Sequence, residues 1–382
     1  MTALTSAELV DLVRSVFPRL EGDRGLALLV DVPRDPAHDN AAWAERRRMA
    51  FDWFVAMRDG AASLSLERVW FYAYPDVGSN NADLPPAAVL LEAPPPETAD
   101  RLAGMGRAVA FDEIFREHQI LIAPTEFSTT APLKVAAPRA GFRAATMPGF
   151  AVSMVPALRV DYGEVARRVD LMKERLDRAD RAEIRFAADD GRTFTLVLDL
   201  AHRAAHASSG RFPARGTAGN LPSGEAYIVP YEGERGVPSR SEGELPVQLG
   251  EEIVVFTIRR NRAVDVTGSG EGARAEIDHL RREPAYGNMA ELGFGVLGDF
   301  GLEPVGEILL DEKLGLHVAF GRSDHFGGSV GPGDFSSPAA VIHLDRIYIP
   351  STQPRIQVPS VTFTYPDGTS ERIMENGRTL VF

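Results

Sequence analysis

The chain has 382 residues, more than one domain usually holds, so we expect two domains. Its formal net charge of −13, with no run of Lys and Arg long enough to follow a phosphate backbone, argues against nucleic acid and anionic membranes as partners. The absence of cysteine excludes disulfides, thiolate metal sites, iron–sulfur clusters and a cysteine nucleophile. Any metal must therefore be bound by His, Asp and Glu side chains.

The first seventeen residues have the pattern of an amphipathic helix with Thr5 or Ser6 as its N-cap. They lack the apolar core and the cleavage site of a signal peptide. No apolar run in the sequence approaches the about 18 residues of a membrane-spanning helix. We therefore expect a cytoplasmic protein.

Residues 1–150 alternate between apolar strand-like runs and helix-like runs, which predicts an N-terminal domain built on an open, largely parallel α/β sheet. The runs fall at 25–33, 41–60, 66–74, 87–93, 99–110, 118–125 and 131–149. Residues 151–206 are predicted to connect the domains through one charged helix at 160–180 and strands at 182–189 and 193–200.

Residues 207–382 are rich in short alternating runs separated by Gly, Pro and Ser, which predicts a strand-rich α+β domain. The pairs Asp367-Gly368 and Asn376-Gly377 are strong turn signals, so we expect the chain to end in an antiparallel meander. The fold class predicted from the sequence is α/β with two lobes, and the C-terminal lobe carries the candidate metal site.

Two histidines lie inside β-like runs of this C-terminal region. His317 lies in LGLHVAFG, and His343 lies two residues before Asp345 in AAVIHLDRIYI. A spacing of two places both side chains on the same face of a strand. A metal site and an ordinary interior His–Asp hydrogen bond both explain the pair, and this local pattern does not separate them.

Two glutamates lie between glycines and apolar residues: Glu225 in GNLPSGEAYIVP and Glu291 in GNMAELGFGVLG. A buried carboxylate is costly unless it is paired or bound to a cation, and metal binding would explain both positions. The combined candidate ligands suit zinc, cobalt, manganese or magnesium at a hydrolytic centre: Glu225, Glu291, His317, His343 and Asp345. Five ligands exceed the needs of one catalytic zinc, so the set predicts two ions about 3.5–4 Å apart that share a carboxylate.

Several ordered segments of the sequence resemble the thermophilic metallo-aminopeptidases related to aminopeptidases T and S. The similar segments are FSTTAPLKVAAPRAGFRAATMPG, GNLPSGEAYIVPYEGERGV, MAELGFGV, DEKLGLHVAFG and HLD. The resemblance implies an N-terminal α/β lobe, a metal-binding C-terminal lobe and a homodimer that removes N-terminal residues from peptides. An amino-acid-derived metabolite is a second substrate class that we expect. It also implies a metal-bound hydroxide as nucleophile, with Glu225 or Glu291 relaying its proton to the leaving amine.

One position departs from the family pattern. The family has a functional tyrosine seven residues after the first metal-binding histidine, and this chain has Asp324 there, followed by His325. Loss of a hydrogen-bond donor to the tetrahedral intermediate would cost roughly 10²–10³ in rate. His325 is therefore a candidate catalytic replacement; the alternative is an exposed loop residue with no such role.

The 2,5-dihydroxypyridine dioxygenases, which use one Fe(II), have a similar scaffold and leave a second function open. They keep the H-x-D pair but have histidine at the position of Glu291 and lack counterparts of Glu225 and His317. The sequence therefore favours the hydrolase. A mononuclear Fe(II) oxygenase, and a biosynthetic enzyme or scaffold protein that only kept the metal-binding fold, are the alternatives.

Overall fold

The computed structural model describes residues 3–382, which have a mixed α/β fold, as the sequence predicts. The chain forms two compact units, one made of residues up to 166 with 210–223, the other of residues 167–209 with 224–382. The predicted division at 150 and 207 differs from these bounds, because residues 151–166 and 210–223 belong to the first unit. Among the described residues, no helix is both long enough and apolar enough to span a bilayer.

The first unit contains a seven-stranded sheet in the order β10-β6-β5-β1-β2-β3-β4. Its strands are β1 (Gly25–Val32), β2 (Arg68–Pro75), β3 (Ala87–Leu91), β4 (Arg107–Ala110), β5 (Ile120–Ala123), β6 (Arg143–Thr146) and β10 (Thr217–Asn220). The strands from β10 to β2 pair in parallel, while β3 pairs antiparallel with both of its neighbours. The sheet is thus largely parallel, as its continuous apolar strands predict.

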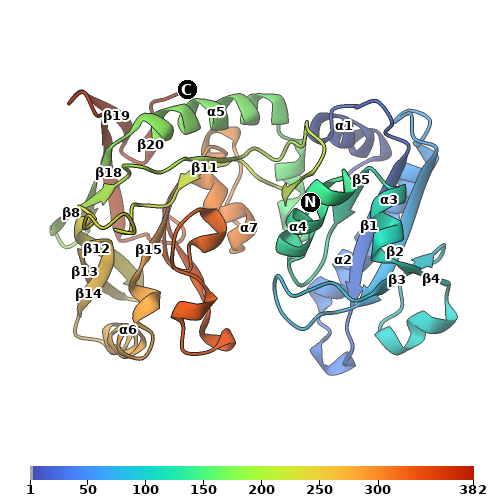
Figure 1. Cartoon of the computed structure of the whole chain (residues 1–382), viewed down its shortest axis with the longest axis horizontal. Helices are drawn as coiled ribbons and strands as arrows, with labels where there is room; N and C mark the ends of the chain where they lie inside the picture. Colours follow the sequence, from blue (N-terminus) through green and yellow to red (C-terminus); the bar gives the residue numbers. More distant parts are fainter. Residues whose placement is uncertain (1–2) are drawn as a thin grey trace. The chain divides into compact units, whose positions relative to one another are not determined.

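Helices cover both faces of this sheet (Figure 1). They are α1 (Ser6–Val16), α2 (Ala41–Asp59), α3 (Phe111–Glu117) and α4 (Thr130–Ala140). α1 begins at the expected cap, since the Thr5 side chain accepts from the Glu8 amide. α2 packs Phe51 and Phe54 against Phe71 of β2, whereas α3 and α4 cover the opposite face of the sheet. Residues 99–110 form a short 3-10 helix (Ala99–Gly104) and then β4.

The second unit contains two antiparallel sheets. The five-stranded sheet has β9 (His206–Ser208), β11 (Glu225–Ile228), β15 (Met289–Gly295), β16 (Leu316–Gly321) and β17 (His343–Tyr348), in the order β17-β16-β15-β11-β9. The eight-stranded sheet has β7 (Arg181–Ala188), β8 (Thr193–Asp199), β12 (Glu242–Leu249), β13 (Glu252–Arg259), β14 (Arg262–Thr267), β18 (Ile356–Thr364), β19 (Ser370–Glu375) and β20 (Arg378–Thr379). Strands therefore dominate this unit, as the sequence predicts.

Three helices accompany these sheets: α5 (Tyr162–Arg178), α6 (Glu271–Arg282) and α7 (Ile308–Asp311). α6 packs on β13 and β14. The predicted C-terminal meander is confirmed, because β18, β19 and β20 pair antiparallel through the two predicted turns. Gly368 and Gly377 have φ values of +83° and +75°, which favour glycine at these positions.

Aromatic side chains on one face of the five-stranded sheet form the core between the two sheets. Ring centroids lie 5.7 Å apart for Phe294 and Phe363, and 4.9 Å apart for Phe320 and Phe256. Because side chains alternate along a strand, burying Phe294 and Phe320 turns their odd-numbered neighbours to the opposite face. Glu291 and His317 are among these neighbours, so packing of the apolar core fixes the face on which the polar residues gather.

Candidate metal centre

The structure brings all five predicted ligand residues together on the face of the five-stranded sheet opposite its aromatic core. Glu225 is the first residue of β11, Glu291 lies in β15, His317 in β16, and His343 with Asp345 in β17. Glu225, Glu291 and His317 are buried, and the side chains of His343 and Asp345 are 19% and 10% exposed. The set is thus nearly closed to solvent on the β11 side and more open at the edge strand β17.

Small residues stand directly opposite the candidate ligands in the neighbouring strands. Gly295 is paired with Glu225, Ala319 with both Glu291 and Asp345, and Gly321 with His343. Gly293 is paired with His317, and a Cβ at Gly293 would collide with Nε2 of that histidine. The glycines and the alanine therefore leave the space into which the longer polar side chains converge.

The ligand atoms form two groups that share one glutamate. Glu225, Glu291 and His317 make the inner group, and Glu291, His343 and Asp345 make the outer group; in each, the possible ligand atoms lie within 4.8 Å of one another. Glu291 Oε1 lies 3.2 Å from His317 Nε2, and Glu291 Oε2 lies 3.3 Å from His343 Nε2. Carboxylate oxygens and imidazole nitrogens at this spacing fit a divalent cation in each group.

The two imidazoles differ in what holds their other ring nitrogen. His343 Nδ1 donates to the Arg322 carbonyl oxygen at 2.8 Å, which leaves Nε2 facing Glu291 and Asp345. Such a second contact fixes the ring orientation of metal-binding histidines. His317 Nε2 also lies 3.6 Å from Glu225 Oε2, but its buried Nδ1 has no hydrogen-bond partner among residues 3–382. Packing over Gly293 and the contact of Nε2 with Glu291, rather than a bond at Nδ1, therefore orient His317.

Without a metal, the carboxylates of this site attract protons to the imidazoles. Burial opposes the charge on His317, yet its hydrogen bond to Glu291 and the charges of Glu291 and Glu225 raise its pKa to about 9. Burial is likewise outweighed at His343, whose pKa is raised well above its usual range by Asp345 and Glu291. The pKa of Glu291 is lowered, because its bonds to His317 and His343 outweigh burial. The cluster therefore favours positive charge, and a bound cation would displace these protons.

A buried lysine that our reading of the sequence did not single out adjoins the inner group. Lys313 is 1% exposed, and its Nζ lies 2.6 Å from Glu225 Oε1 and also contacts the Glu312 carboxylate. Burial lowers the pKa of Lys313, but the Glu225 and Glu312 carboxylates outweigh it and raise the pKa above the usual lysine range. Burial raises the pKa of Glu312 to about 8. Lys313 thus holds Oε1 of Glu225 and leaves Oε2 facing His317.

The candidate catalytic His325 lies beside the outer group rather than inside it. It belongs to a short 3-10 helix (Asp324–Phe326), and its ring centroid lies 5.5 Å from that of His343. Burial, together with the charges of His343 and Arg322, lowers the pKa of His325 to about 4. At neutral pH it is therefore an uncharged imidazole of an exposed residue, next to a candidate metal ligand. Asp324 forms an ion pair with Arg322 at 2.6 Å, which occupies its carboxylate.

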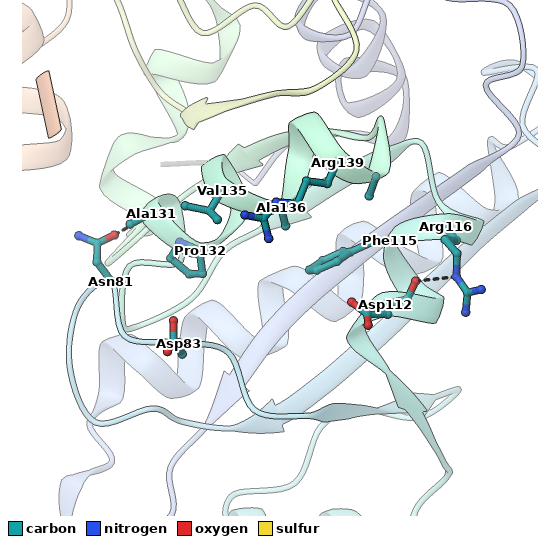
Figure 2. Close-up of a pocket in the computed structure, with 11 residues that line it drawn as sticks. Asn81, Asp83, Asp112, Phe115, Arg116, Ala131, Pro132, Val135, Ala136 and Arg139 are labelled. Atoms are coloured by element: carbon teal, nitrogen blue, oxygen red, sulfur yellow. Dashed lines mark hydrogen bonds between the residues drawn. The ribbon is translucent and has the colours of Figure 1, made fainter. Parts of the chain in front are cut away.

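A separate cavity of about 660 Å³ lies in the first unit, where Figure 2 shows side chains from α3 and α4 around it. Arg116 Nε donates to the Asp112 carbonyl oxygen at 3.0 Å, and Asn81 accepts from the Ala131 amide at 3.0 Å. No member of the inner or outer group lines this cavity. Its acidic residues belong to neither of the two metal-binding groups found among residues 3–382. This cavity is therefore separate from the candidate metal centre, whose five residues all belong to the second unit.

Comparison with known proteins identifies the fold. No protein-family model matches the chain, and no curated protein matches it either. Among solved structures, 2,5-dihydroxypyridine dioxygenase from Pseudomonas putida KT2440 matches with a TM-score of 0.57 and 15% identity, covering 99% of this chain and 98% of that one. AmpT from Thermus thermophilus, an aminopeptidase T, matches with a TM-score of 0.54 and 16% identity, covering 98% and 99%. The chain therefore has, along nearly its whole length, the fold of these two enzymes.

Proposed function

We propose that the protein is a metal-dependent, aminopeptidase-like hydrolase that cleaves the N-terminal amide of a small peptide or amino-acid-derived metabolite. The observation that carries this proposal is the sharing of Glu291 between two ligand groups. A carboxylate that offers one oxygen to each group suits a pair of divalent ions, which is a common design of hydrolytic centres. The fold that the chain shares with AmpT supports the same reaction class.

In such a reaction, different residues of the protein would bind the metal ions, transfer the proton and donate a hydrogen bond. When bound, a pair of divalent ions such as zinc, cobalt, manganese or magnesium would polarise the scissile carbonyl and make a water molecule more acidic. Lys313 holds Glu225 Oε1, so Oε2 is the oxygen of Glu225 that is free to bind a cation or to move a proton. Either this oxygen or Glu291 carries the proton of the attacking water to the leaving amine. The uncharged His325 is placed to donate a hydrogen bond near the outer group.

A mononuclear Fe(II) dioxygenase is the second candidate. The fold shared with 2,5-dihydroxypyridine dioxygenase supports it, and the outer group of Glu291, His343 and Asp345 could hold one iron. Against it stands a further carboxylate, Glu225, which lies with His317 and the same Glu291 in the inner group. One iron would leave part of this buried negative charge without a cation.

Metal analysis separates these candidates. The protein is stripped with a chelator, reloaded with zinc, cobalt or manganese, and assayed for metal content and for hydrolysis of aminoacyl anilides. Two ions per chain with turnover support the hydrolase, whereas one tightly held iron with oxygen consumption on a dihydroxypyridine would replace it by the oxygenase. A protein that takes up no metal and gains no thermal stability from divalent ions would instead be a scaffold that kept only the fold.

We further propose that the protein acts in the cytoplasm as a homodimer on a small-molecule or peptide substrate, without nucleic acid or membrane partners. The acidic composition supports the absence of these partners, because a net charge of −13 repels phosphate groups. Analytical ultracentrifugation tests the dimer: a single species of about 83 kDa, twice the chain mass of 41.5 kDa, is the expected result.

A further inference from the structure

We propose that Tyr227 is a catalytic hydrogen-bond donor of this site, and that its phenol stabilises the oxygen that becomes negatively charged when the amide carbon is attacked. The inference rests on the proposed function, because it assigns a role within the hydrolytic reaction.

The strand register places Tyr227 on the same face as the candidate ligands. Tyr227 lies two residues after Glu225 in β11, so both side chains leave the strand on one side. It is directly opposite Gly293 in β15, and Gly293 is in turn directly opposite His317 in β16. The Cα atoms of Tyr227 and His317 are thus about 10 Å apart, two strand spacings, with no side chain between them.

His317 reaches across this gap toward β11. Its Nε2 lies where a Cβ of Gly293 would be and is 3.6 Å from Glu225 Oε2. Tyr227 therefore stands beside the inner group rather than in the core between the sheets.

Neighbouring rings hold Tyr227 in place. Its ring stacks on His206 with centroids 5.1 Å apart and meets Phe326 edge-on at 4.8 Å. His206 Nε2 in turn donates to the Phe326 carbonyl oxygen at 2.8 Å, which ties β9 to the segment after β16. The Phe326 ring lies 5.5 Å from that of His343 in the outer group. A ring fixed in this way loses little entropy when its hydroxyl donates to a substrate.

The hydroxyl of Tyr227 is unusual among the tyrosines of the second unit. The hydroxyls of Tyr286 and Tyr348 donate to Glu276 and to the Pro246 carbonyl oxygen, and that of Tyr231 accepts from the Arg235 amide. Tyr227 is 8% exposed, and none of the hydrogen bonds found within residues 3–382 uses its hydroxyl. Unlike the hydroxyls of Tyr72 and Tyr74, it is not among the fully buried side-chain atoms without a partner, so it is accessible and can donate to a substrate oxygen in the metal site.

The test uses Tyr227→Phe in the metal-loaded full chain, with Tyr231→Phe as the matched control and His325→Ala as the rival donor. Activity is measured with aminoacyl anilides, and affinity is measured by calorimetry with an aminoalkylphosphonate, which mimics the tetrahedral intermediate. For Tyr227→Phe we expect kcat to fall roughly 10²-fold and phosphonate affinity to fall about tenfold or more. KM is expected to stay within about threefold of the wild type and the metal content at two ions.

Three results would overturn the assignment. Tyr227→Phe with kcat within twofold of the Tyr231→Phe control would remove Tyr227 from the reaction, as would a rate loss confined to His325→Ala. A Tyr227→Phe protein that has lost its metal would show that the ring only supports the ligands. In each of these cases the wild type stays active, whereas a wild type that holds two ions but neither turns over nor binds the phosphonate refutes the proposed function and this role together.

Discussion

The inner and outer groups of the candidate metal centre share Glu291 but lie in different surroundings. The inner group, with Glu225 and His317, is buried and has the Lys313 ammonium 2.6 Å from Glu225. The outer group, with His343 and Asp345, lies on the edge strand β17 and is partly exposed. One sheet face thus carries two candidate cation sites of similar ligand chemistry but unequal electrostatic surroundings.

Because of this difference, we expect the two groups to bind a cation with unequal affinity. The fixed positive charge of Lys313 beside the inner group weakens the attraction of that group for a cation. The outer group has two carboxylates and no ammonium in contact with its ligands. We therefore expect the outer group to bind metal more tightly, and the inner group to complete the centre.

The largest effect is expected from Glu291→Gln, because this residue belongs to both groups. The amide keeps the size of the side chain but removes the charge that both cations share. Metal content should fall from two ions to fewer than one per chain, and anilide hydrolysis should be lost. Elemental analysis and steady-state kinetics measure both. Glu276→Gln, on α6 beyond both groups, is the control; two ions retained by Glu291→Gln would disprove the sharing.

Lys313→Met breaks the inner group differently, because it leaves Glu225 and Glu312 buried without their ammonium partner. Removing one member of a buried ion pair costs roughly 3–5 kcal/mol, so the metal-free protein should lose about that much unfolding free energy. Added zinc or manganese should restore more stability than in the wild type. Chemical denaturation with and without metal measures this. Lys173→Met, at an exposed ion pair with Asp177, is the control and should change stability by less than about 1 kcal/mol.

The stability of the metal-free protein should depend on pH through His317. Its pKa is raised from 6.5 to about 9 in the folded state, so folding is favoured while the ring binds a proton that the unfolded chain releases. This stabilisation is complete below about pH 6.5 and is lost as the pH rises through about 9, on the order of 3 kcal/mol. Denaturation between pH 6 and 10 tests it. His317→Gln should flatten the curve, and an unchanged curve in this variant would contradict the assignment.

The smallest effect concerns the order in which the two groups fill. Asp345→Asn weakens the outer group alone, whereas His317→Gln weakens the inner group alone. Calorimetric titration of the metal-free protein should give two dissociation constants that differ by about tenfold, equivalent to about 1.4 kcal/mol. The Asp345→Asn variant should lack the smaller dissociation constant, which we assign to the outer group. If His317→Gln lacks the smaller constant instead, the inner group binds metal first and the inferred order is reversed.

Much of the fold could be predicted because its signals are local. The apolar runs of β1 and β2, the capping residue Thr5 and the turns at Gly368 and Gly377 each lie within a few neighbouring residues. The bounds of the two units were harder to predict. β10 joins the sheet of the first unit by pairing with β6, which lies more than seventy residues earlier in the chain. The local sequence at residues 217–220 does not predict this pairing.

The five candidate ligands could be chosen from the sequence because each is a polar residue in an apolar or glycine-marked segment, where an unpaired charge is costly. The same signal was available for Lys313, which precedes an apolar strand, but the sequence does not show that its ammonium meets Glu225, 88 residues away. Asp324 stands where the resembling family has a tyrosine, and the sequence suggested only the adjacent His325 as a replacement hydrogen-bond donor. The pairing of Tyr227 with Gly293, and of Gly293 with His317, adds Tyr227 as a second candidate donor.

The sequence by itself determined the mixed α/β class, the likeness to metallo-aminopeptidases and the polar residues available to bind metal, since alternation along a strand is a property of nearest neighbours. Only the tertiary structure decided which residues meet. The antiparallel register of β11, β15, β16 and β17 sets Glu225, Glu291 and the two histidines within reach of one another, and packing of Phe294 and Phe320 on the second sheet selects the face. Both depend on contacts between distant segments, which form only when the whole core is assembled.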